Sequence, residues 1–181
     1  MGLLDWLMAL FGRRRTSVAK LRNELLDLDQ QQAVWKTRVR RAEDDRQELY
    51  LRGIRSTEER VKEECADRVL ELENNIRHYS SLIAGLEAQK NNLNALIRTL
   101  EASEMTADRE EMARRQKEIE RLTQEVRLSQ QRLAESQIDI RAMETGRIDT
   151  APERPPERQR ILDAMKAPGM SADRLPKIER E

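Results

Sequence analysis

The stretch that decides the fold lies at residues 69–100 and reads VLELENNIRHYSSLIAGLEAQKNNLNALIRTL. Its apolar side chains recur in alternating steps of three and four residues, with Lys90 as the polar interruption. Such spacing places side chains on one face of an α-helix. No proline precedes residue 152, so a helix over residues 57–103 has nothing to end it early. The apolar positions are Val69, Leu72, Ile76, Tyr79, Ile83, Leu86, Leu93, Ile97 and Leu100. A helix of this length needs an apolar partner along its face.

The composition agrees with long helices. Of the 181 residues 38% are charged and only 3% are aromatic, which is typical of coiled coils and leaves little material for strands. We expect an all-α, elongated antiparallel helical hairpin with an N-terminal amphipathic helix and a further C-terminal helical arm. Cys65 is the only cysteine, so no internal disulfide is possible.

Charge is distributed unevenly although the net charge is zero. Residues 1–56 hold 12 basic and 8 acidic residues, and the remainder holds 22 basic and 26 acidic residues. The basic front part can meet the acidic back part of the same or another chain, or an anionic surface.

Residues 1–12 form an amphipathic segment that contains the run GLLDWLMALF. Its apolar side chains fill one continuous arc of a helix, but the run is too short to span a bilayer. It also lacks the basic start and cleavage site of a signal peptide. We interpret it as a helix lying in the membrane interface; the alternative is a short helix that caps a bundle. The residues expected to bind membrane are Leu3, Leu4, Trp6, Leu7, Met8, Leu10, Phe11, Arg13, Arg14 and Arg15.

The next segment repeats apolar residues in heptads from Val18 to Leu49, with Gln32 and Arg46 as polar interruptions. The opposite face is basic. It either is a solvated surface or serves polymer and membrane contacts. The residues of this basic face are Lys36, Arg38, Arg40 and Arg41.

A turn is predicted near residues 53–56, inside a hairpin core that spans residues 13–102. Gly53 falls at an apolar position, and Ser56 with Glu59 has the spacing of a capping box. A short connection makes the two helices antiparallel neighbours. We then expect Leu28 to lie near Tyr79; one continuous helix is the alternative.

An acidic helical arm is predicted over residues 103–148, with a weak apolar stripe that suits a movable element. Residues 149–181 follow as a proline-rich linker, a short helix and a tail, and we expect residues 150–181 to be dispensable for folding. The residues that could bind a partner are Ile161, Leu162, Met165, Leu175, Pro176 and Ile178.

Residues that could carry chemistry are few. His78 is the only histidine and is interpreted as a partly buried helix residue. Cys65 has no nearby ligand type, and no phosphate-binding glycine loop is present. We expect no catalytic residues, no metal site and no cofactor, and therefore no enzyme. Interspersed acids argue against nucleic-acid binding.

The order of these features resembles the ESCRT-III family. The run RQELYLRG at residues 46–53 is similar to the family's hairpin tip, and LEAQKNNL at residues 86–93 to its second core helix. The resemblance covers about residues 1–145. The related phage-shock protein A and plastid vesicle-inducing proteins rank second, because their hairpin arms are longer.

The resemblance implies a cytoplasmic, peripheral membrane protein that polymerises into filaments to bend or sever anionic membranes. It also implies sister subunits as partners and an AAA ATPase that reads the C-terminal tail. The segments LDAMK at residues 162–166 and LPKI at residues 175–178 are similar to parts of such tail motifs. A soluble coiled-coil scaffold or adaptor remains the alternative function.

Overall fold

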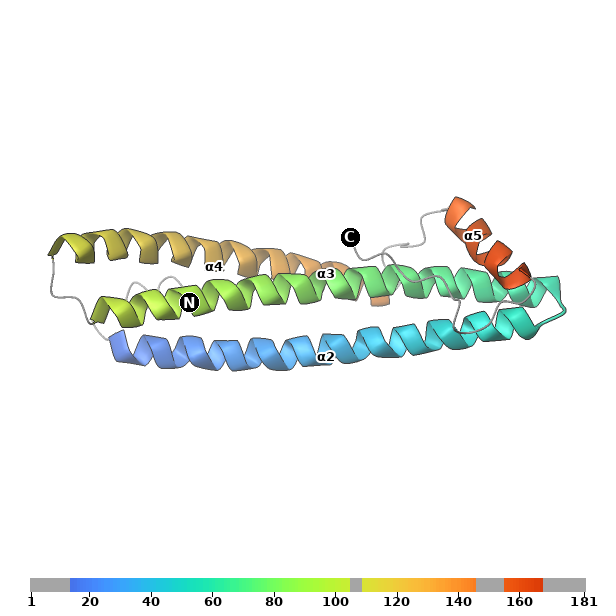
Figure 1. Cartoon of the computed structure of the whole chain (residues 1–181), viewed down its shortest axis with the longest axis horizontal. Helices are drawn as coiled ribbons and strands as arrows, with labels where there is room; N and C mark the ends of the chain where they lie inside the picture. The colour runs from blue at the N-terminus through green and yellow to red at the C-terminus, as the bar shows by residue number, and fades with distance from the viewer. Residues whose placement is uncertain (1–13, 105–108, 146–154, 168–181) are drawn as a thin grey trace. The chain divides into compact units, whose positions relative to one another are not determined.

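A computed structural model describes residues 14–104, 109–145 and 155–167 of the chain. These residues are 96% helical and include no strand, so the fold is all-α as predicted. They form four helices, which are α2 (Arg14–Arg55), α3 (Glu59–Glu104), α4 (Arg109–Glu144) and α5 (Pro155–Lys166) (Figure 1). No helix in this part of the chain has the length and apolarity needed to cross a membrane.

The connection between α2 and α3 occupies residues 56–58, so it overlaps the predicted turn only at Ser56. The backbone N–H of Ser56 donates to the Arg52 carbonyl at 3.1 Å, so helical bonding continues past Gly53. Because that N–H is already used, the Glu59 carboxylate cannot close the expected capping box. Instead, the Ser56 hydroxyl accepts a bond from the Glu58 N–H at 3.1 Å. The prediction of two helices is confirmed, but Gly53 belongs to the last turn of α2.

The described residues fall into two compact units. The first contains residues 14–34, 82–104 and 109–137, and the second contains residues 35–81, 138–145 and 155–167.

The first unit is a three-helix bundle. The Arg22–Glu101 ion pair, 2.6 Å long, joins the beginning of α2 to the end of α3, so these helices run antiparallel. Gln130 of α4 donates to Glu24 of α2. The Cβ atom of an alanine at position 85 would lie 2.9 Å from a methyl carbon of Leu133, so glycine leaves room for this side chain of α4. The core contains Leu21, Leu28, Leu82, Leu86, Leu93, Leu96, Ile97, Ile119, Leu122, Val126 and Leu133.

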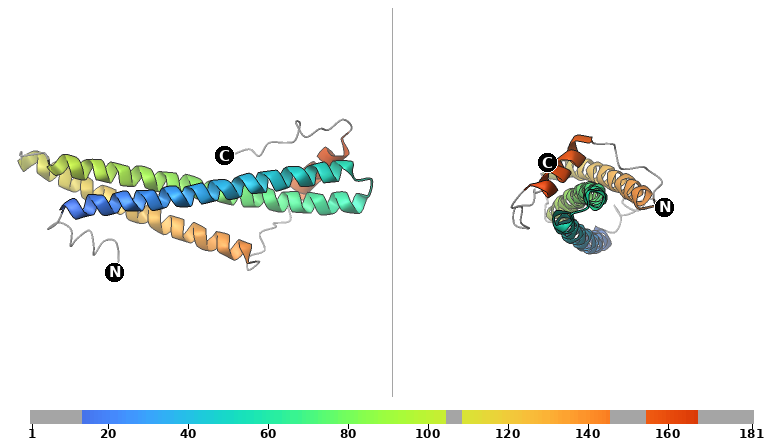
Figure 2. Two further views of the ribbon diagram at one scale, coloured as in Figure 1. Left: turned by 90° about the horizontal axis from the view of Figure 1, so that it is seen from below. Right: turned by 90° about the vertical axis from the view of Figure 1, so that its right-hand side faces the viewer.

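The second unit pairs the rest of α2 with the beginning of α3. Trp35 packs on Tyr79 with ring centroids 5.4 Å apart, which is a favourable aromatic distance. The pKa of Tyr79 is raised, first by burial and then by the nearby Glu144 carboxylate. In this unit α5 lies against the end at which α2 and α3 are connected (Figure 2).

The polar interruptions of the two apolar stripes meet one another. Within the first unit, Lys90 donates to Gln32 at 3.2 Å and pairs with Asp29. Within the second, Arg46 pairs with Glu73 at 3.4 Å. A slipped pairing would leave these groups buried without partners, so they fix the register of α2 on α3.

This register corrects the expected neighbourhood of Leu28. Its neighbour Asp29 pairs with Lys90, whereas Tyr79 packs on Trp35. The physical reason is that the connection occupies residues 56–58, which moves every antiparallel pair further along α3.

Candidate functional site

The candidate site is the surface where α5 docks, and its helix is encoded locally. Pro155 and Pro156 stand in the first turn, where a missing N–H costs no helical bond. Glu157 lies in the first turn and Lys166 in the last, which suits the helix dipole.

Three apolar side chains of α5 are buried in what we call the hairpin-end cluster. Ile161, Leu162 and Met165 are 0%, 4% and 3% exposed. Positions i, i+1 and i+4 lie on one side of a helix, so all three face the hairpin together. The cluster consists of Tyr50, Cys65, Ala66, Val69, Leu70, Ile161, Leu162 and Met165.

Gly53 of α2 lies directly against Met165 of α5. A Cβ atom at this position would lie 2.5 Å from the Met165 sulfur, closer than real contacts allow. The sequence predicted a turn glycine, but the structure places Gly53 inside α2 as a contact point for α5. The missing side chain therefore leaves room for the end of the Met165 side chain.

Ion pairs join α5 to α3 on both sides of the cluster. The exposed pairs among them contribute only about 0–1 kcal/mol each, so they orient α5 more than they hold it. The Lys166 ammonium, which bonds to Glu59, holds the pKa of that carboxyl below its usual value. The pairs are Lys166–Glu59, Arg158–Asp67, Arg77–Glu157 and Arg160–Glu73.

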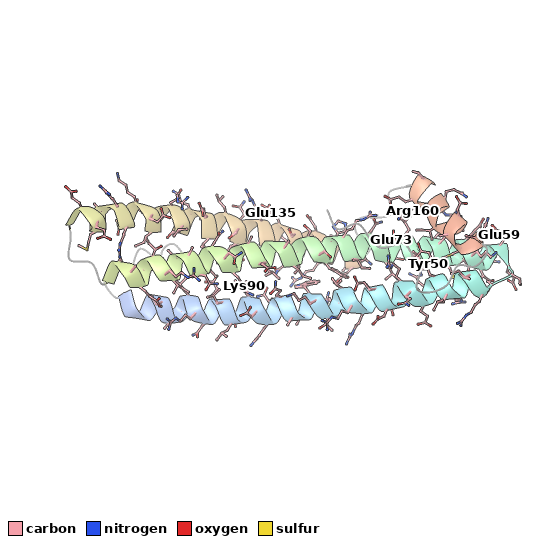
Figure 3. The ribbon with its side chains drawn as sticks, viewed as in Figure 1. Tyr50, Glu59, Glu73, Lys90, Glu135 and Arg160 are labelled. Atoms are coloured by element: carbon pink, nitrogen blue, oxygen red, sulfur yellow. The ribbon has the colours of Figure 1, made fainter. Side chains whose placement is uncertain are left out.

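Glu73 is a buried carboxylate shared by two helices. It is 1% exposed and lies 3.4 Å from Arg46 of α2 and 3.5 Å from Arg160 of α5 (Figure 3). Two guanidinium groups offset the cost of burying one carboxylate. Departure of α5 would therefore remove one of its two counter-charges.

Two further groups of the cluster are titratable. Burial, followed by the Glu73 charge, raises the pKa of Tyr50 to about 12, and its buried hydroxyl has no hydrogen-bond partner. Burial also raises the pKa of the Cys65 thiol, which keeps it protonated and unreactive while α5 is docked.

The four residues of the predicted basic face differ in their contacts. Lys36, Arg40 and Arg41 are exposed on α2. Arg38 instead pairs with Glu144 at 2.6 Å, and its guanidinium carbon lies 4.4 Å from the centre of the Trp35 ring. All four side chains are exposed, but Arg38 is also engaged in contacts within the chain.

Other predicted residues divide between described and undescribed parts of the chain. Residues 1–13 lie outside the described residues, as do Leu175, Pro176 and Ile178; Arg14 and Arg15 begin α2. The short helix does not stand apart as a tail, because its three apolar residues are packed in the hairpin-end cluster. The α4 sequence holds equal numbers of acidic and basic residues, so the helix itself is not acidic.

Sequence reasoning missed several residues of this site. Tyr50 and Glu73 were not singled out, Cys65 was considered only for disulfide and metal chemistry, and Arg160 was not assigned a partner. The available indication was that three basic residues flank the apolar side chains of α5, at a spacing that matches acids along α3. His78, expected to be partly buried, is exposed.

Comparison with known proteins identifies no relative. No protein-family model matches the chain, and no curated protein or solved structure matches it. Within the described ranges, no group of three or more His, Cys, Asp or Glu side chains is arranged to hold a metal ion.

Proposed function

We propose that this protein is an ESCRT-III-like membrane-remodelling protein that polymerises on anionic membranes to bend or sever them. It would act as a peripheral protein on the cytoplasmic side, with the segment before α2 as its membrane contact. The observation that carries the proposal is the helical hairpin with α5 docked on its closed end by three apolar side chains and a set of ion pairs.

Docking of α5 supports a protein that changes state. Each buried apolar side chain contributes about 1.5–3 kcal/mol, but ordering a 12-residue helix opposes much of that gain. The margin that holds α5 on the hairpin is thus small, so another partner can replace the contact. Release would expose the hairpin-end cluster for contacts in an assembly.

The same contact bears on the proposed ATPase partner. Ile161, Leu162 and Met165, which lie in the tail motif, are buried in the docked state. A domain that reads this motif must therefore bind after α5 has left the hairpin. Such a domain would then bind only the assembled form, in which α5 has left the hairpin.

The deciding experiment is flotation of the full chain with anionic liposomes, followed by negative-stain microscopy. We expect the protein to float with phosphatidylserine vesicles and to form filaments on them. Trp6→Glu with Leu7→Glu should abolish flotation while circular dichroism retains the helix content, because two charges enter the apolar arc.

A matched variant with Met112→Glu places a charge on an exposed position of α4 and should leave flotation unchanged, because it lies outside the amphipathic segment. Wild-type protein that stays with the soluble fraction at low salt would refute the proposal and favour a soluble coiled-coil scaffold. Flotation without filaments or vesicle deformation would favour a phage-shock-type maintenance role.

A further inference from the structure

The two buried sulfur atoms of the described residues both lie in the hairpin-end cluster. Cys65 and Met165 are each 3% exposed and belong to this cluster. Of the other methionines that the structure describes, Met112 is 42% exposed and Met143 is partly buried, and both lie on α4. The oxidisable sulfur atoms that are shielded from solvent are therefore those at the surface where α5 docks.

Met165 has no room for an added atom on the side that faces α2. Its sulfur lies 2.5 Å, and its methyl carbon 3.0 Å, from the point where a Cβ atom on Gly53 would lie. The sulfur can take this position only because residue 53 has no side chain. Ile161 and Leu162 of α5 are buried in the same cluster. An oxygen atom added to the sulfur of docked Met165 would thus be enclosed by the α2 backbone and apolar side chains.

We propose that Met165 is an oxidation site, and that a hydroperoxide releases α5 from the hairpin by converting its thioether to a sulfoxide that cannot dock. In this reaction the sulfur donates an electron pair to the terminal oxygen of the hydroperoxide, and an S–O bond forms as the O–O bond breaks. The proton of that oxygen passes to the leaving alkoxide or hydroxide. The sulfur is oxidised by two electrons, and the hydroperoxide is reduced to an alcohol or to water.

The change in polarity is what opposes docking. A thioether is apolar and fills a gap in a core, whereas a sulfoxide oxygen is a hydrogen-bond acceptor. Water satisfies this acceptor when α5 is undocked, and docking would remove that water. An acceptor buried without a donor opposes burial, so the oxidised helix should remain off the hairpin.

The docked helix protects its own sulfur atom. Because Met165 is 3% exposed, oxidation requires α5 to leave the hairpin transiently, and the rate should follow the undocked population. A thioether loses no proton in the reaction, whereas the Cys65 thiol reacts as the thiolate and burial raises its pKa. Methionine sulfoxide reductases reverse the oxidation, so α5 can dock again. The inference concerns the docking of α5 alone and does not rest on the proposed membrane function.

The test measures hydrogen–deuterium exchange of the full chain before and after treatment with hydrogen peroxide. A Cys65→Ala background, whose α5 exchange before treatment is matched to that of the wild type, leaves methionine as the only oxidisable sulfur. Once Met165 is oxidised, the amides of α5 should exchange roughly ten- to a hundredfold faster, because docking would bury an unpaired acceptor. Amides of the first unit should keep their rates, and methionine sulfoxide reductase should restore those of α5.

Met165→Leu is the matched control, because leucine keeps the apolar volume without an oxidisable sulfur. Its α5 amides should exchange at the same rate before and after peroxide. Met112→Leu removes an exposed methionine of α4 and should leave the response to peroxide unchanged. Met165→Gln, a polar side chain of similar length, should release α5 without any oxidant.

A Met165 sulfoxide that docks, for instance by accepting a bond from the unpartnered Tyr50 hydroxyl, would leave α5 exchange unchanged and overturn the inference. An equal response of Met165→Leu would overturn it as well. Ile161→Ala should oxidise Met165 roughly 30- to 150-fold faster relative to Met112, because it raises the undocked population. The absence of any acceleration would show that α5 docking does not shield this sulfur.

Discussion

Replacing Ile161 with alanine is expected to release α5 from the hairpin. Ile161 is fully buried in the hairpin-end cluster, so truncation removes apolar contacts and leaves a cavity. Such substitutions cost about 2–5 kcal/mol, and a small cluster that can relax belongs near the lower end. A loss of about 2–3 kcal/mol raises the undocked population roughly 30- to 150-fold.

Cys65 supplies the assay, because the only cysteine of the chain is buried in the same cluster. Labelling of its thiol by a soluble disulfide reagent in native buffer should accelerate by the same factor as the undocked population. Undocking also removes the burial that raises the thiol pKa, so both effects act in the same direction. Ile161→Val, which removes one methylene group, should give an acceleration of about two- to tenfold.

The control is Leu133→Ala, an equally drastic truncation at the α4 contact of the first unit. It should lower the midpoint of urea unfolding without accelerating Cys65 labelling in native buffer. If Ile161→Ala leaves the labelling rate at the wild-type value, α5 is not what shields Cys65, and the docking energetics argued above are wrong.

Two further changes test the packing. Tyr50→Phe removes a buried hydroxyl that lacks a partner and should leave stability at pH 7 equal or about 1 kcal/mol higher. The pKa of Tyr50 in the folded state is raised from 10 to about 12, so the stability that comes from its neutral phenol is complete below pH 10 and is lost as the pH rises towards 12. Between pH 10 and pH 12 the midpoint of urea unfolding should therefore fall more for the wild type than for the variant. Gly85→Ala should stabilise the fold by about 1 kcal/mol, through the higher helix propensity of alanine, only when Leu133 is also replaced by alanine. In that background the Leu133 methyl carbon, which would lie 2.9 Å from the new Cβ atom, is absent. Equal effects in both backgrounds, measured by a double-mutant cycle, would contradict a packing role for Gly85.

Periodicity was sufficient to predict the four described helices and their order, because apolar spacing is a local property of the chain. The apolar spacing could not show that both α2 and α4 pack on α3 in the first unit. Leu82 and Leu96, which lie outside the predicted stripe, are as buried as Leu86 and Leu93 within it. A single stripe describes one partner, and α3 in the first unit has two.

The polar interruptions were visible in the sequence but their pairing was not. Gln32 and Arg46 interrupt α2, and Lys90 interrupts the stripe of α3; which group meets which depends on the exact length of the connection. The docking of α5 was missed for a related reason. Three apolar residues on a short helix fit a distant partner as well as the chain's own hairpin, and only the fold decides between them.

The three-residue connection between α2 and α3 also has a consequence for how the chain reaches its structure. Residues on either side of it are close in sequence, so bringing them together costs little loop-closure entropy. Pairing that starts there can proceed towards both distant ends, and each step closes only a short further loop because the residues before it are already paired. Chains organised in this way fold rapidly. While a ribosome is still releasing the segment that becomes α4, the hairpin end already contains every residue that it needs except those of α5.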